Sequence, residues 1–237
     1  MPVKLRVGND RPARFHPCGQ LIWCRPIMSV TRQMLFRSLA VLAALAGWVG
    51  LAVQLWILLR NMGLGAGLWR FLGFFTILTN LGAAIVATAV AAGSIQGLAG
   101  ARSRLIAATS SLVVGIVYSV ALRALWNPQG LQKLADFALH DAVPLIWAFL
   151  WIAAPHDRLP WRAIGWAILP PALYAVYALV RGAIDGWYAY WFLDPSRQSW
   201  GELMVSIAVM SAGFAVLAAV LVGIDRVLGR RSPRPTA

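Results

Sequence analysis

Charged residues are scarce in this chain. Only 12% of the 237 residues are Asp, Glu, Lys or Arg, and 60% are hydrophobic. Soluble proteins carry roughly a quarter charged residues. The mean hydropathy is +0.70. Because so few charged groups cannot cover a soluble surface, the composition excludes an ordinary soluble domain and predicts an integral membrane protein.

Residues that often carry catalysis or bind metals are also few. The chain has three histidines and two cysteines. Cys18 and Cys24 lie close to His16, but their spacing matches no zinc site, so we expect these cysteines to have no functional role. The sequence contains no P-loop, GxSxG, HExxH or paired-cysteine motif. These absences argue against nucleotide, serine-hydrolase and zinc chemistry, and we predict no metal and no cofactor.

Six apolar runs are long enough, or nearly so, to cross a bilayer as helices. They are 35–59, 71–92, 105–126, 139–154, 163–180 and 203–228. The fourth run is short, but apolar residues from Leu131 onward extend its helical pattern toward the N-terminus. We therefore predict an all-α fold, a polytopic integral membrane bundle of six transmembrane helices over 34–229. A flexible basic tail (1–33) precedes this domain and a disordered basic end (230–237) follows it.

The net charge of +13 is distributed as in a membrane protein. Most basic residues fall on one side of the predicted membrane, namely Lys4, Arg6, Arg11, Arg14, Arg25, Arg32, Arg37, Arg102, Arg104, Arg158, Arg162, Arg226, Arg230, Arg231 and Arg234. The positive-inside rule therefore predicts that both termini are cytoplasmic. A basic rim also attracts anionic membrane lipids. No basic cluster lies on a soluble face, so we expect no nucleic-acid partner.

Two predicted helices carry polar residues suited to acyl transfer. Thr76, Thr79 and Asn80 share one face of the predicted helix 71–92 through their spacing of three and four residues. His140 begins the fourth run, and the predicted topology places it near the same outer end as Thr76. A hydroxyl nucleophile, an imidazole base and a carboxamide oxyanion donor suffice to attack an ester. We predict these roles for Thr76, His140 and Asn80, respectively.

Structural roles for the same residues remain open. Each threonine could bond the carbonyl one turn back, and Asn80 could join two helices. His140 could simply face lipid headgroups and water. Asp136, one turn before it, and Asp141, beside it, could each orient its ring. Pro144 is predicted to kink or widen the helix one turn further on.

One connection is unusually rich in aromatic residues. The segment 186–194 has the sequence GWYAYWFLD. Aromatic side chains are enriched where membrane proteins meet the headgroup layer. The pattern therefore fits two structures, a lid over a binding site and an interfacial anchor.

Three segments resemble one family of membrane proteins. They are WRFLGFFTILTNL at 69–81, LHDAVPLIWAFLWI at 139–152 and GWYAYWFLD at 186–194. In this order they resemble a bacterial branch of the androgen-induced protein-like family, small multi-helix membrane proteins. Its animal members are threonine hydrolases of fatty acid esters of hydroxy fatty acids. The resemblance implies that Thr76 is the nucleophile and His140 the base, in a protein of the bacterial inner membrane.

The resemblance also implies a lipid ester substrate. We expect it to be contacted by six residues around the pair, namely Thr79, Asn80, Asp141, Trp187, Tyr190 and Asp194. In the animal pattern an Asn or Asp follows the threonine more closely than Asn80 follows Thr76, so Thr79 remains an alternative nucleophile. The alternative function is a non-enzymatic membrane protein, either a small-molecule transporter or an assembly partner. The sequence does not indicate the oligomeric state.

Overall fold

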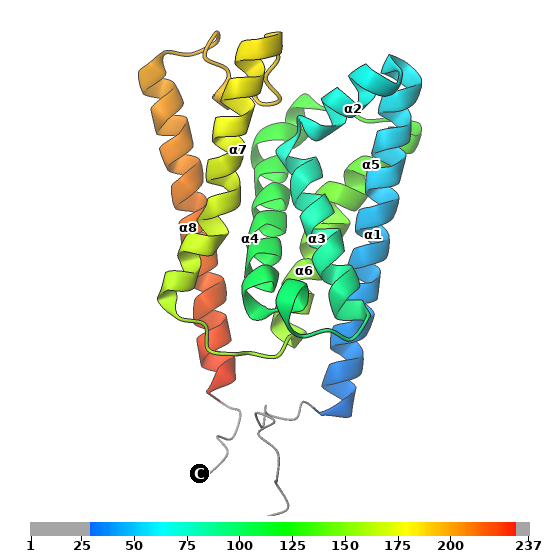
Figure 1. Ribbon diagram of the computed structural model, residues 1–237, viewed down its shortest axis with the longest axis vertical. Coiled ribbons are helices and arrows are strands. Elements are labelled where there is room, and N and C mark those ends of the chain that lie inside the picture. The colour runs from blue at the N-terminus through cyan, green and yellow to red at the C-terminus, as the bar shows by residue number, and fades with distance from the viewer. Residues whose placement is uncertain (1–28, 231–237) are drawn as a thin grey trace, which may run out of the picture.

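The computed structural model describes residues 29–230, and this part of the chain is helical without a β-strand (Figure 1). The α-helices are α1 (Val30–Met62), α2 (Leu64–Leu72), α3 (Phe75–Ala91), α4 (Ala101–Val117), α5 (Gly130–Phe137), α6 (Val143–Ala153), α7 (Ile164–Asp185) and α8 (Trp200–Gly229). Short 3-10 helices are η1 (Gly97–Ala99), η3 (Arg123–Leu125), η5 (Trp161–Ala163) and η6 (Trp191–Leu193). Two π-helical turns, η2 (Tyr118–Leu122) and η4 (Ala138–Ala142), continue α4 and join α5 to α6.

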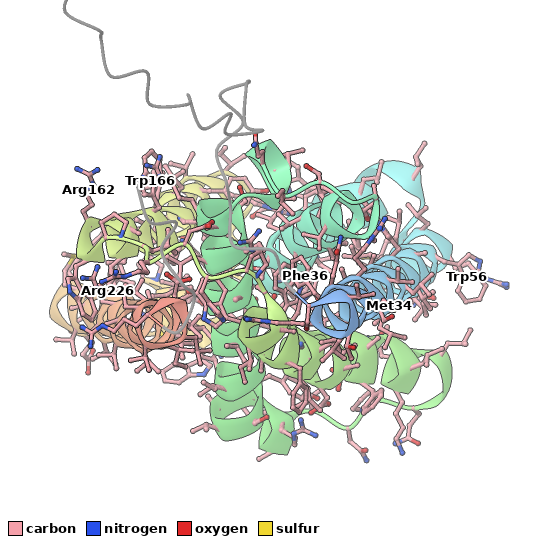
Figure 2. All side chains as sticks on the ribbon, turned by 90° about the horizontal axis from the view of Figure 1, so that it is seen from below. Met34, Phe36, Trp56, Arg162, Trp166 and Arg226 are labelled. Atoms are coloured by element: carbon pink, nitrogen blue, oxygen red, sulfur yellow. The ribbon has the colours of Figure 1, made fainter. Side chains whose placement is uncertain are left out.

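The predicted all-α bundle is confirmed. Within 29–230, five helical stretches are long and apolar enough to cross a membrane, or six when the bent pair α2–α3 counts as one span. Many large apolar side chains face outward, such as Leu42, Val180 and Val205, as expected where the surroundings are lipid. In Figure 2, Trp56 and Trp166 also point away from the bundle.

The boundaries of the domain differ slightly from the prediction. Helix α1 begins at Val30, four residues before the predicted start of the membrane domain, with Ser29 capping its first turn. Helix α8 ends at Gly229, where the domain was expected to end. The predicted extension of the fourth run is confirmed, because α5, η4 and α6 form one stretch from Gly130 to Ala153. Residues 1–28 and 231–237 of the two predicted tails lie outside the described residues.

Helix α4 lies at the centre of the bundle. It packs against α3 and α6 on one side and against α7 and α8 on the other (Figure 1). Small residues let α1 approach its neighbours closely. A Cβ on Gly47 would lie 3.1 Å from the Cβ of Ala84, and one on Gly50 would lie 2.8 Å from Leu139. Such close packing is how helices associate where lipid removes the hydrophobic drive between them.

At the end of the bundle opposite α2, buried hydrogen bonds join α8 to the connection between α6 and α7. The Asp225 carboxylate on α8 accepts hydrogen bonds from the backbone N–H groups of Asp157 (3.2 Å) and Leu159 (2.6 Å). Nδ1 of His156 lies 3.1 Å from the same carboxylate, and its Nε2 lies 3.2 Å from the Ile152 carbonyl. These hydrogen bonds hold the connection between α6 and α7 against the end of α8. They also satisfy the Asp225 carboxylate, which would otherwise be costly to bury in an apolar protein.

The expected single helix over 71–92 is wrong. The chain breaks at Gly73 and Phe74, and α2 and α3 meet at an angle of 81°. Phe74 has an extended backbone, with φ −95° and ψ 132°. The carbonyls freed by the break are bonded from α7, since the Tyr174 hydroxyl donates to Gly73 O (2.8 Å) and the Tyr177 hydroxyl to Leu72 O (3.2 Å). We call this break, with its two tyrosines, the elbow.

A buried arginine fills the space beneath the elbow. The Arg181 guanidinium on α7 lies 4.2 Å from the ring centroid of Trp69 and 5.3 Å from that of Trp187. A Cβ on Gly73 would lie 2.5 Å from Nη1 of Arg181 and 2.6 Å from the ring of Trp187. Position 73 therefore requires glycine for close approach, although its backbone conformation is an ordinary helical one.

Gly73→Ala tests the packing of the elbow. The added methyl group must displace Arg181 or Trp187, so we expect a loss of about 1–3 kcal/mol in the free energy of unfolding, the range typical of overpacking. Thermal unfolding of the purified protein in detergent measures this loss. The matched control is Gly82→Ala in α3, where the new Cβ would meet nothing within 4 Å. The control should be neutral or stabilising by up to about 1 kcal/mol. Equal effects of the two substitutions would contradict this account of the elbow.

Candidate functional site

The two π-helical turns of the described chain bring Tyr118 and His140 together. Their rings stack with centroids 4.0 Å apart and planes at 19°. Proline has no backbone N–H, so Pro144 cannot bond the carbonyl of His140 four residues earlier, and the turn before it widens. This widening is confirmed by η4. A Cβ on Gly115 of α4 would lie 3.2 Å from the His140 carbonyl, so α4 approaches the widened turn closely.

Asp136 orients the imidazole of His140. The Tyr118 hydroxyl donates to Oδ2 of Asp136, while Oδ1 lies 3.3 Å from Nδ1 of His140. The same nitrogen lies 3.1 Å from the Asp136 carbonyl. Because both neighbours are acceptors, Nδ1 carries the proton and Nε2 is left as the basic nitrogen. Within 29–230, Nε2 makes no hydrogen bond, so it is available to accept a proton.

The break at the elbow places Thr76 at the start of α3, whereas we had expected it inside a longer helix that begins at residue 71. It is the second residue of α3. The backbone N–H of Thr76 donates to the Tyr190 hydroxyl (3.4 Å), and the two hydroxyl oxygens are 3.3 Å apart. The first N–H groups of a helix lack internal partners and carry the positive end of its dipole. The Thr76 hydroxyl is therefore beside groups that favour developing negative charge.

Tyr190 comes to this position from the aromatic segment 186–194. Its ring stacks on Phe192 at 5.2 Å and meets Tyr174 edge to face at 6.1 Å. Burial holds the pKa of the Tyr190 phenol above its ordinary value. The hydroxyl therefore stays protonated near neutral pH and can donate a hydrogen bond.

Asn80 lies beneath Thr76 and uses both of its amide protons structurally. Nδ2 donates to the carbonyl of Thr76 (2.8 Å) and to that of Leu139 (3.3 Å), which joins α3 to η4 directly before His140. The side chain is 1% exposed. Since both donors are occupied, Asn80 is arranged to fix the relative positions of Thr76 and His140, and the oxyanion role that the sequence suggested has no free donor there.

Two cavities meet at Thr76, Tyr118, His140 and Tyr190, which line both. The first, which we call the apolar cavity, has a volume of about 250 Å³ and is walled by α4, α7 and α8 through residues such as Val114, Ala175 and Phe214. The second, which we call the polar cavity, has about 570 Å³ and includes Gln54, Asn61, Arg70, Gln132 and Asp136. No hydrogen bond joins Thr76 to His140 in the described chain. The two residues are related only through the cavities that both of them line.

Thr79 faces a different part of the molecule. It lines a third cavity of about 450 Å³ between α3, α4 and α7, together with Ser110 and Tyr177. Neither Thr76 nor His140 lines that cavity. Of the two threonines considered as nucleophile, only Thr76 shares a cavity with His140.

The remaining predicted residues lie around the site without lining either of its cavities. Asp141 pairs with Arg123. The Asp194 carboxylate accepts hydrogen bonds from the Ser196 hydroxyl (2.6 Å) and backbone, which lower its pKa, and pairs with Arg197 (3.2 Å). Both carboxylates therefore have partners away from the cavities.

Trp187 supports the elbow instead of the cavities. It meets Phe74 edge to face at 5.3 Å and stacks over the Arg70 guanidinium at 4.0 Å. Segment 186–194 thus places Tyr190 in the site and Trp187 against the elbow.

Sequence reasoning missed Tyr118 and Arg70. Tyr118 lies in an apolar helix, and its partner Asp136 follows 18 residues later on another helix, so no short-range pattern could have drawn attention to it. Arg70 had been counted only as a charge for membrane topology. No group of three or more His, Cys, Asp or Glu side chains within 29–230 is placed to hold a metal ion.

Comparison of the chain with protein-family models, with curated proteins and with solved structures found no match.

Proposed function

We propose that this protein is a membrane-embedded hydrolase of lipid esters, with Thr76 as the nucleophile and His140 as the base. One observation carries the proposal: the Thr76 hydroxyl and a free imidazole nitrogen border the same two cavities within a bundle of apolar helices. The resemblance to threonine hydrolases of fatty acid esters of hydroxy fatty acids supports the same chemistry. Such esters are the first substrates to test.

The proposed reaction begins with attack of Thr76 Oγ1 on the ester carbonyl carbon, while Nε2 of His140 takes the hydroxyl proton. Asp136 and Tyr118 keep the imidazole in the required tautomer and orientation. The carbonyl oxygen then carries negative charge. The positive end of the α3 dipole, the Thr76 backbone N–H and the Tyr190 hydroxyl lie beside Thr76 Oγ1 to stabilise it.

Collapse of this intermediate expels the alcohol, which takes the proton from His140 and leaves an acyl ester on Thr76. A water molecule then attacks the acyl ester as His140 accepts a proton again. As this second intermediate collapses and releases the fatty acid, His140 returns its proton to Thr76 Oγ1 and restores the hydroxyl. The Tyr190 hydroxyl lies 3.3 Å from Thr76 Oγ1, so substrate binding has to shift this contact from the threonine to the substrate oxygen.

A small-molecule transporter is the second candidate. The sharp break between α2 and α3 is the feature that favours it, because transporter sites are often built on discontinuous helices. A transporter would use the two cavities as a path and would need no basic nitrogen. A chemical readout of ester cleavage separates the two candidates.

We also propose that the protein lies in the bacterial inner membrane with both termini in the cytoplasm. The first residues of α1 and the last residues of α8 lie at the same end of the bundle (Figure 1), and Arg162 and Arg226 project near that end (Figure 2). Reporter tags whose activity depends on compartment, fused to each terminus in turn, should both report the cytoplasm. A tag exposed outside at either terminus would contradict this topology.

Substitution of the proposed pair tests the mechanism. Thr76→Ala and His140→Ala should each lower the kcat of ester hydrolysis by at least about 1,000-fold, since each removes an essential partner of one chemical step. The double variant should lose little more than either single one, because members of one catalytic unit are not additive. Release of fatty acid from a defined ester by protein in detergent micelles measures all three.

Thr79→Ala is the matched control, because it removes a threonine hydroxyl from the third cavity, which neither Thr76 nor His140 lines. It should keep most of the activity. Thr76→Ala and Thr79→Ala should both remain folded, since losing one hydroxyl costs about 1 kcal/mol. Full activity of Thr76→Ala, or activity lost only in Thr79→Ala, would rule out Thr76 as the nucleophile.

A further inference from the structure

The third cavity is a groove that runs along three helices. Its lining residues recur every three or four positions, from Phe75 to Val86 on α3, from Ser103 to Ser110 on α4 and from Pro170 to Tyr177 on α7. Each helix therefore turns one face toward the groove. The face of α3 is about 16 Å long, because a helix rises about 1.5 Å per residue. A groove of this length suits an extended hydrocarbon chain.

The groove is open at its outer side and has no charged lining residue. Gly82, Leu98 and Leu173 line it and are exposed. A Cβ on Gly82 would meet nothing within 4 Å, so there is open space beside α3 at this point. None of the lining residues is Asp, Glu, Lys, Arg or His. A lipid chain can therefore enter from the bilayer, whereas a charged group in the groove would have no partner.

Two hydroxyl groups of the groove have no hydrogen-bond partner. Thr79 and Ser110 are only 8% and 3% exposed, and neither hydroxyl makes a hydrogen bond within 29–230. The usual partner of such a hydroxyl in a helix is the carbonyl one turn back. Thr88, on the same helix as Thr79, uses this partner, since its hydroxyl donates to the Ala84 carbonyl (2.7 Å). Because an unpaired hydroxyl is costly in apolar surroundings, Thr79 and Ser110 point to a ligand that carries an oxygen.

The other hydroxyls of the groove are already bonded. The Ser103 hydroxyl donates to the Gly97 carbonyl (3.2 Å). The Tyr174 and Tyr177 hydroxyls donate to the carbonyls freed at the elbow. A polar group of the ligand is therefore expected at one level of the groove, beside Thr79 and Ser110.

This level lies deep in the bundle. Helices α3 and α4 are neighbours joined through η1, so they run in opposite directions. Thr79 lies about three turns before the end of α3, and Ser110 about two and a half turns after the start of α4. Both are thus about 14–18 Å from the connection, or roughly half of the 30 Å hydrocarbon thickness. A phospholipid keeps its charged headgroup at the membrane surface, so the oxygen at this depth belongs to an uncharged lipid.

We infer that the third cavity binds a long-chain alcohol, whose chain lies along the groove and whose hydroxyl pairs with Thr79 and Ser110. A ligand hydroxyl both donates and accepts, so it can bond both side chains whichever of them donates, whereas a carbonyl oxygen only accepts. Neither Thr76 nor His140 lines the groove, so this ligand is distinct from the proposed ester substrate. The alcohol site does not require that the protein hydrolyses esters.

Photolabelling tests this site. Hexadecanol that carries a diazirine beside its hydroxyl is added to the full-length protein in phospholipid nanodiscs, and mass spectrometry locates the label. The label should lie on the residues of α3 and α4 around Thr79 and Ser110. Unlabelled hexadecanol should compete about 3- to 10-fold better than hexadecane or palmitic acid at the same mole fraction, the range expected for one hydrogen bond. Equal competition by hexadecane would show that the groove holds any lipid chain and would overturn the alcohol site.

Variants of α4 separate the hydroxyl contact from general packing. Ser110→Ala should lower specific labelling by about 3- to 10-fold. The matched control is Ser111→Ala, because Ser111 is also buried on α4 without a hydrogen-bond partner within 29–230 but lines none of the three cavities. The control should label as the wild-type protein does. Equal effects of the two substitutions would contradict the role of Ser110.

A substitution that fills the groove provides an independent check. Gly82→Leu places a side chain in the open space beside α3 and should abolish labelling around Thr79 and Ser110. Thermal unfolding of the same variant in detergent shows whether it remains folded. Undiminished labelling in folded Gly82→Leu would place the alcohol elsewhere and overturn the assignment.

Discussion

The candidate site depends on the elbow between α2 and α3. A helix can break within an apolar bundle only if its freed carbonyls find donors, and here the Tyr174 and Tyr177 hydroxyls of α7 supply them. The break turns Thr76 from a residue inside a helix into one at a helix start, where its hydroxyl lies at the positive end of the dipole and beside the Tyr190 hydroxyl. The same break directs α2 across the end of the bundle, which brings Arg70 to the polar cavity.

A second constraint is the widened helical turn that carries His140, on the other side of the cavities from Thr76. Pro144 widens the turn before it, and the resulting π-helical turn holds His140 against Tyr118 and over Asp136. Asn80 then joins the two sides, because its amide donates hydrogen bonds to the carbonyl of Thr76 and to that of Leu139, the residue before His140. Pro144 creates one irregular turn locally, the α7 tyrosines permit the other, and one buried amide joins the two. The chemistry we propose uses these irregular points, whereas the regular parts of the helices provide the surroundings.

Much of this could be predicted from the sequence, and the exceptions have a common cause. Apolar length alone identified the spans, and Pro144 signalled its own widened turn, because both are local properties of the chain. The elbow could not be predicted, since Gly73 and Phe74 are apolar and the donors that permit the break lie about a hundred residues later on α7. Arg70 was visible only as a charge, because its stacking on Trp187 and its place in the polar cavity depend on residues far away in the sequence.

The most direct test of the central claim is a search for the acyl ester on Thr76. A p-nitrophenyl ester of a fatty acid acylates quickly, so acid quenching soon after mixing should trap the intermediate, and mass spectrometry of the digested protein locates it. The account predicts an added acyl mass on Thr76, greatly reduced in His140→Ala. Ester hydrolysis without any acylated residue, or acylation at Thr79, would contradict it.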